Sequence, residues 1–242
     1  MGEDRYGTDM VERFELAFNQ IHHHLKILNN YPKNDNFMEL MQQSKAKHSV
    51  IRQHFEQLKQ LAKLRNAIVH ERIRDDYYIA YPHLEVVETI EKIKQTLDQP
   101  PKTLEWATTP VLYYRSYSPL SNILDAFTQH RVSQFPVYDK EHQFLGLLTN
   151  DGLVNWLAHN QSNGSISTED VQASHVLEFE QAHNVHFLDS ASTIFDLEEA
   201  FERNGEAKSK LKAVIITDGG NPNKEPVGIV TAWDLIKIDH PL

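Results

Sequence analysis

Apolar side chains recur at three- and four-residue spacing through most of residues 9–99. This pattern is typical of amphipathic helices and predicts them over residues 10–28, 37–41, about 49–73 and 84–97. Tyr31-Pro32 ends the first helix and Pro100-Pro101 ends the last, because proline does not continue a helix. We therefore expect residues 1–100 to form an up-and-down helical bundle.

Beyond Pro101 the pattern changes to short β-branched runs that alternate with amphipathic helices, and the same order occurs twice. The first unit has strand patterns at 110–114, 133–139 and 144–149, with helices at 119–130 and 151–158. The second has strand patterns at 185–188, 212–218 and 226–231, with helices at 191–203 and 233–237. A β-α-β-β-α unit found twice indicates an internal duplication. We expect an α+β chain with repeated units at 104–160 and 185–242 and a linker at 161–184.

Four short motifs give these units a family resemblance. They are PVYD and LGLLTND in the first copy, and VIITD and VGIVTAWDL in the second. They resemble a tandem pair of CBS domains, the Bateman module, and residues 228–234 reproduce that family's G-h-h-T-x-x-D signature. The resemblance implies an adenine nucleotide (AMP, ATP or a cyclic dinucleotide) bound between the units. It implies that Asp234 holds the ribose, that Thr231 holds the phosphate, and that apolar strand residues such as Val214 enclose the adenine.

The signature residues also have a physical reading of their own. Gly228 lets its strand approach a ligand or a neighbouring segment without a Cβ in the way. Thr231, at a strand-to-helix corner, can cap the helix or offer its hydroxyl to a phosphate or sugar oxygen. Asp234, in the first helical turn, can accept the two hydroxyls of a ribose. The alternative is that Thr231 and Asp234 only cap the helix.

The first copy departs from the signature. Thr149 is followed by Asn150 and Asp151, and Gly152 stands where the signature places its aspartate. The cleft at Thr149 is therefore expected to be altered or empty, with Asp151 either a ligand contact or a helix N-cap. Arg131 and Lys212 are the candidate cations for a phosphate, and the alternative is that both are solvated surface charges.

A second, shorter motif lies in the helical half. The run RNAIVH at residues 65–70 places Arg65 about 20° from Leu58 around the helix, inside the apolar stripe. Its R-x4-H pattern resembles the HEPN superfamily of helical bundles, many of which are metal-independent ribonucleases. The resemblance implies His70 as general acid/base, Arg65 as the group that stabilises charge on the phosphorane, and Asn66 as an orienting residue. In the alternative, Arg65 pairs with an acid such as Glu15, Glu85 or Glu88, and His70 only ends the helix.

Composition limits the possible functions further. The net charge is −10, with most of the acidic excess after residue 100, which disfavours nucleic-acid binding by the duplicated half. The chain has no cysteine, which excludes disulfides, thiolate catalysis and cysteine-based zinc sites. The polar N-terminus and the absence of a membrane-length apolar run argue for a cytoplasmic protein. No metal site or required cofactor is expected.

Two hypotheses follow from these observations. In the first, the chain is a regulator that senses an adenine nucleotide and transmits binding to the helical half, which assembles as a homodimer or contacts a protein partner. In the second, the chain is an RNA-cleaving enzyme that the duplicated half gates, with Arg65, Asn66 and His70 at its centre. Nothing in the duplicated half has a catalytic pattern, so the sequence favours the regulator.

Overall fold

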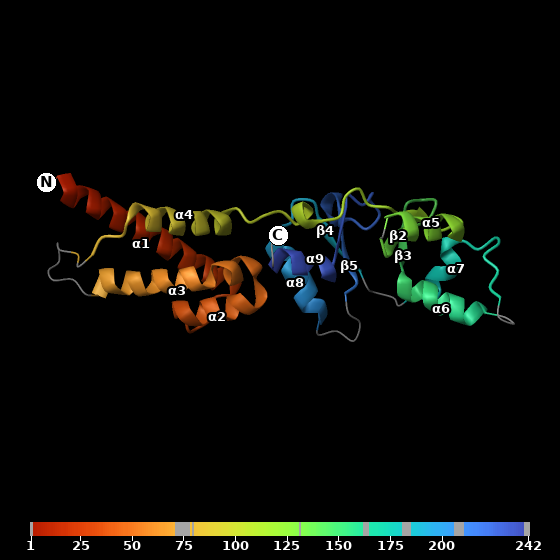
Figure 1. Cartoon of the computed structure of the whole chain (residues 1–242), viewed down its shortest axis with the longest axis horizontal. Helices are drawn as coiled ribbons and strands as arrows, with labels where there is room; N and C mark the ends of the chain where they lie inside the picture. The colour runs from red at the N-terminus through yellow and green to blue at the C-terminus, as the bar shows by residue number, and fades with distance from the viewer. Residues whose placement is uncertain are drawn as a thin grey trace. The chain divides into compact units, whose positions relative to one another are not determined.

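The computed structural model describes residues 2–70, 78, 80–130, 132–161, 165–180, 185–205 and 211–239. These residues divide into two compact units, Met1–Pro101 and Lys102–Leu242. The first unit is helical and the second combines helices with two small sheets (Figure 1). The chain is therefore α+β, with the change of architecture at the predicted Pro100-Pro101 boundary.

The first unit contains four helices within the described residues: α1 (Gly2–Leu28), α2 (Phe37–Lys47), α3 (Ser49–His70) and α4 (Leu84–Asp98). Helix α1 contacts each of the other three, and α2 also packs on α3 (Figure 1). Their apolar stripes are fully buried, as the spacing predicts, at Phe14, Ile21, Leu25, Leu40, Ile51, Leu58, Ile68 and Ile90. The predicted helices are confirmed, although α2 continues six residues beyond the expected end, to Lys47.

Several polar contacts fix the ends and register of this bundle. The Asn36 side chain accepts hydrogen bonds from the backbone N–H groups of Met38 and Glu39, which caps the start of α2. Arg13 on α1 donates to both carboxylate oxygens of Glu91 on α4, at 2.9 and 2.8 Å. This bidentate ion pair links α1 to α4 beside their apolar contact.

The second unit carries the same strand order twice. One sheet has the order β1-β2-β3 and the other β4-β5-β6, with a parallel first pair and an antiparallel second pair in each. The strands are β1 (Tyr114–Arg115), β2 (Gln134–Tyr138), β3 (Phe144–Thr149), β4 (Val185–Asp189), β5 (Ala213–Thr217) and β6 (Gly228–Thr231). The helices are α5 (Leu120–His130), α6 (Asn150–Asn160), α7 (Ala173–Leu177), α8 (Ile194–Gly205) and α9 (Ala232–Asp239), with short 3-10 turns η1 (Thr103–Trp106) and η2 (Asp218–Gly220). The predicted duplication is confirmed.

The first predicted strand is mostly wrong. Of residues 110–114 only Tyr114 lies in a strand, because β1 is two residues long. The segment before it pairs with the other sheet instead, since Thr108 forms an antiparallel bridge to Ile229. Its apolar residues Val111 and Leu112 line a cavity beside that bridge, which accounts for their hydrophobicity without a strand.

The segment before β1 bonds to the second repeat and extends its sheet by an isolated bridge to β6. The backbone N–H of Thr103 donates to the Ser192 carbonyl at 2.9 Å, and that of Thr108 donates to the Ile229 carbonyl at 2.9 Å. The start of α5 bonds to the range between the repeats, since the Leu120 N–H donates to the Val171 carbonyl at 2.8 Å, next to α7. The chain at the start of the first repeat is therefore bonded to β6, the strand that ends at Thr231.

The range 161–184, expected to be a linker, contains a short helix within its described residues. Helix α7 begins at Ala173, and its residues Ala173 and Val176 are fully buried in the core of the first sheet. The chain then continues through Phe179 and Glu180 toward β3 and α6. The hydrophobic residues of this stretch are too few to show helical periodicity, so α7 could not be predicted from spacing.

Candidate functional site

Thr231 and Asp234 lie at the corner where β6 enters α9. The carboxylate Oδ2 of Asp234 accepts hydrogen bonds from the backbone N–H and from the hydroxyl of Thr231, both at 2.9 Å. The other oxygen, Oδ1, lies 2.7 Å from the Nζ atom of Lys237. Asp234 is buried, with 7% of its surface exposed. The pair therefore caps α9, and this cap also holds the carboxylate in one orientation at the corner.

A cavity of about 270 Å³ lies against β6, the strand that leads to this corner. Ile229 is part of its wall, and because it stands two residues before Thr231 on β6, the two side chains share one face of the strand. The Oε1 atom of Gln134, another wall residue, is buried and has no hydrogen-bond partner among the described residues. The remaining wall is mostly apolar and consists of Thr108, Pro110, Val111, Leu112, His130 and Val132. The cavity therefore combines apolar walls with a buried polar atom that lacks a partner.

The corresponding corner of the first repeat, where β3 enters α6, is built differently. The backbone N–H of Thr149 donates to Oε1 of Glu180 at 2.5 Å, and its hydroxyl donates to Oε2 at 3.1 Å. Glu180 lies 31 residues further along the chain, in the segment after α7. The Thr149 hydroxyl oxygen also accepts the backbone N–H of Gly152 at 3.3 Å. A carboxylate thus bonds both donors of Thr149, as Asp234 does for Thr231, but it comes from a distant residue.

Comparison with known protein families decides what the second unit is. The family model described as the CBS domain matches residues 104–159 and 178–240, which are the two repeats. The C-terminal half of the chain is a pair of CBS domains. A search of curated proteins gives no match.

Solved structures similar to this chain include other CBS domains. The CBS domain of a membrane protein from Sphaerobacter thermophilus is 20% identical, with coverage of 63% of this chain and 97% of that one and a TM-score of 0.44. The CBS domain of a bacterial CNNM/CorC family Mg²⁺ transporter is 17% identical, with coverage of 65% and 85% and a TM-score of 0.42. The CBS pair of protein MJ0100, solved with 5-methylthioadenosine and S-adenosyl-L-methionine, is 14% identical, with coverage of 57% and 94% and a TM-score of 0.41.

The other sequence-predicted residues of the CBS pair take distinct places. Asp151 and Lys212 form an ion pair with each other, which joins α6 to the residue before β5. Thr149, and not Asp151, is the N-cap of α6. Val214 is fully buried in the middle of β5, where it pairs with Val230, so it is a core residue. Arg131 lies outside the described residues.

Gly228 is explained by the close approach of the segment that contains Leu104 and Ala107. A Cβ at this position would lie 2.8 Å from Leu104 Cδ1 and 2.9 Å from Ala107 Cβ, both in the segment that crosses from the first repeat. Contacts this short force a neighbour to move. Of the two readings of Gly228, the close approach of a neighbouring segment is the one that the geometry supports.

The surroundings of Glu180 shift the pKa of its carboxyl group. Removal of the carboxylate from water raises its pKa above the ordinary value, and the charge of Asp151 acts in the same direction. The hydrogen bonds from Thr149 and the charge of Lys212 oppose this shift without cancelling it. Glu180 is therefore a half-buried carboxylate in a site that disfavours its negative charge.

Sequence reasoning did not identify Glu180 or Gln134 as site residues. Glu180 is remote from the signature, so its position could only follow from the path of the chain after α7. Gln134 had a weak signal, because it stands two residues before the PVYD motif, at the start of β2.

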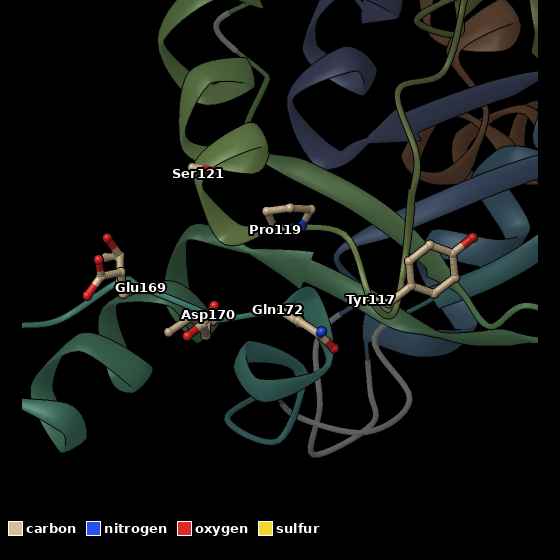
Figure 2. Close-up of a pocket in the computed structure, with 8 residues that line it drawn as sticks. Tyr117, Pro119, Ser121, Glu169, Asp170 and Gln172 are labelled. Atoms are coloured by element: carbon tan, nitrogen blue, oxygen red, sulfur yellow. The ribbon is translucent and has the colours of Figure 1, made fainter.

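A second cavity of about 420 Å³ lies elsewhere on the CBS pair. Figure 2 shows Pro119 and Ser121 at the start of α5, with Glu169, Asp170 and Gln172 on the segment before α7. None of the sequence-predicted site residues lines it. Its acidic wall does not suit a nucleotide phosphate.

The residues of the R-x4-H motif all belong to α3. The Arg65 guanidinium carbon lies 5.9 Å from the centroid of the Phe18 ring of α1, and Asn66 is exposed. The side chain of His70 lies outside the described residues. Within one helix, residues five apart point about 140° away from each other. The RNA-cleaving role of Arg65, Asn66 and His70 stays a prediction.

Two further findings concern membranes and metals. Within the described ranges, no helix combines the length and the apolarity that crossing a bilayer requires. No group of three or more metal-ligating His, Asp or Glu side chains is found among the same residues.

Proposed function

We propose that the CBS pair binds an adenine nucleotide at the corner of Thr231 and Asp234, with the base in the adjoining cavity of about 270 Å³. The observation that carries the proposal is the position of this cavity. Its wall includes Ile229, which lies on the same face of β6 as Thr231, and Thr231 is hydrogen-bonded to Asp234 in the first turn of α9. A flat apolar base and a polar sugar need this combination of walls and acceptors.

Each part of the nucleotide has a counterpart in the site. Val111, Leu112 and Ile229 supply apolar walls for the base, and the side-chain amide of Gln134 can pair with its polar edge. The Asp234 carboxylate can accept the ribose hydroxyls, since the Thr231 N–H alone keeps it oriented. The Thr231 hydroxyl then becomes available to a phosphate oxygen.

The protein then acts as a regulator. A nucleotide that binds one arrangement of the CBS pair more tightly than another shifts the population toward that arrangement. The helical unit is the part of the chain that reports the shift, through its assembly as a homodimer or through a protein partner. This coupling predicts that the sedimentation behaviour of the full chain, measured by analytical ultracentrifugation, changes when the nucleotide is added.

Calorimetric titration of the full chain tests nucleotide binding. The panel consists of adenosine, AMP, ADP, ATP and cyclic di-AMP. Asp234→Ala is expected to weaken binding about 100-fold or more, because hydrogen bonds to a charged group contribute ~1.5–3 kcal/mol each. Gln134→Leu is expected to weaken it about tenfold, for loss of one neutral hydrogen bond.

A matched control separates binding from a general effect of acid removal. Asp218 is an exposed acid in η2 of the same repeat, so Asp218→Ala is expected to leave affinity unchanged. Circular dichroism confirms that each variant is folded, since Asp234 also caps α9. Binding of no adenine compound by the wild type, or binding that Asp234→Ala leaves intact, contradicts the proposal.

A further inference from the structure

The two strand-to-helix corners differ in how many acceptor atoms they leave for a ligand. At Thr231, one oxygen of Asp234 accepts both hydrogen bonds from the threonine, and the second oxygen accepts one from Lys237, whose side chain is 69% exposed. At Thr149, both oxygens of Glu180 are used, one by the N–H and one by the hydroxyl. At Thr149 each carboxylate oxygen therefore already accepts a hydrogen bond from the threonine, whereas at Thr231 one carboxylate oxygen does not.

The space at the two corners differs in the same way. A Cβ on Gly152 would lie 2.0 Å from Oε1 of Glu180 and 2.3 Å from its Cδ. The Glu180 carboxylate therefore occupies the volume that an aspartate side chain at position 152 would need. Gly152 itself is buried, so solvent does not fill this volume.

The charge at the Thr149 corner opposes an anionic ligand. Glu180 and Asp151 both bring carboxylates to it, and Lys212 is engaged with Asp151. A phosphate placed here meets two acids and a cation that is already neutralised, which disfavours its binding by like-charge repulsion.

We propose that Glu180 is a built-in occupant of the cleft at Thr149, so that the CBS pair binds one nucleotide per chain, at Thr231 and Asp234. This inference rests on the proposed function for the identity of the ligand. It assigns a function to a residue outside the family signature, because Glu180 determines which of the two corners is open.

Equilibrium dialysis of the full chain against AMP, ATP and cyclic di-AMP in separate cells measures the number of bound molecules. The wild type is expected to bind one per chain, and Asp234→Ala none. The double variant Gly152→Asp with Glu180→Ala restores the threonine–aspartate spacing and removes the occupant, so it is expected to bind two. Glu180→Gln keeps the shape of the occupant, and its expected number remains one.

The outcomes separate this inference from the proposed function. A wild type that binds two, or a double variant that still binds only one, overturns the inference and leaves the proposed function standing. If the wild type binds none and the double variant binds one, the proposed function fails and the occupant role of Glu180 stands. Absence of binding in both contradicts both. Glu180→Ala alone, which keeps the Thr149 cap on Gly152, gives a second open variant if the double variant does not fold.

Discussion

The corners at Thr149 and Thr231 have the same backbone framework, in which an antiparallel strand ends at a threonine and a helix begins. In both, a carboxylate accepts the threonine N–H and hydroxyl. At Thr231 the carboxylate comes from the next helical turn, while at Thr149 it comes from a segment 31 residues away. The same hydrogen-bonding requirement is thus met in two ways.

This difference shows that capping and ligand binding compete for the same atoms. A carboxylate three residues after the threonine can cap the helix with one oxygen and keep the other for a ligand. A carboxylate that enters from outside uses both oxygens and fills the adjacent volume. The source of the carboxylate therefore separates an open corner from a closed one.

The largest expected difference concerns one glycine in each of the strands that lead to the two corners, Gly228 in β6 and Gly146 in β3. In Gly228→Ala the new Cβ meets Leu104 and Ala107 at 2.8 and 2.9 Å, so overpacking is expected to lower the free energy of unfolding by ~1–3 kcal/mol. In Gly146→Ala it meets only Leu177, at 3.3 Å, and the expected loss is below ~1 kcal/mol. Urea denaturation of both variants checks this order. Equal losses would show that the contacts with Leu104 and Ala107 do not constrain position 228.

Removal of the threonine hydroxyl is expected to lower stability more at Thr149 and to weaken nucleotide binding only at Thr231. Thr149→Val loses a hydrogen bond to a half-buried carboxylate and the cap on Gly152, at a cost of ~1–3 kcal/mol. Thr231→Val keeps the N–H bond to Asp234, and ~1 kcal/mol is expected. Only Thr231→Val is expected to weaken nucleotide binding. Weaker binding in Thr149→Val would contradict the closed corner.

The pH dependence of the stability is expected to report the ionisation of Glu180. Because its pKa is raised in the folded state, its contribution is complete below the ordinary value of 4.5 and is lost as pH rises through the raised value. Glu180→Gln cannot ionise, so unfolding midpoints of this variant should lack that decline. The difference between wild type and variant across an acid-to-neutral series measures it. Parallel curves would show that the Glu180 carboxylate is not held in the cleft.

The smallest effect is expected for the ion pair between Lys212 and Asp151. The Lys212 side chain is 36% exposed and that of Asp151 69%, so Lys212→Met should cost only ~0–1 kcal/mol of stability. Nucleotide affinity should not change, because Lys212 belongs to the closed corner. A clear loss of affinity would instead assign Lys212 to phosphate binding, as the sequence suggested.

The sequence allowed most elements of the fold to be predicted because their periodicity is strong. The bundle helices and the repeated strand order follow from spacing alone. The segment 110–114 was misread because apolar residues that line a cavity resemble those of a buried strand. Helix α7 could not be predicted because it is short and gains its stability from packing on the first sheet.

The candidate site was predictable only where its residues are local. Thr231 and Asp234 are three residues apart, so their mutual contact follows from helix geometry. Glu180 reaches Thr149 through the path of the chain, which no local pattern encodes. Arg65 shows the same limit, because its place on the apolar stripe of α3 did not reveal the contact with Phe18 of α1.

Photoaffinity labelling with 8-azido-AMP, followed by peptide mapping, tests most directly where the nucleotide binds. The account predicts that the label attaches to the cavity wall beside Thr231, in the peptides that contain Val111, Leu112, Val132 or Ile229. Excess unlabelled AMP should suppress it, and Asp234→Ala should abolish it. A label on the peptides around Gly152 or Lys212, at the corner that Glu180 occupies, would contradict the account.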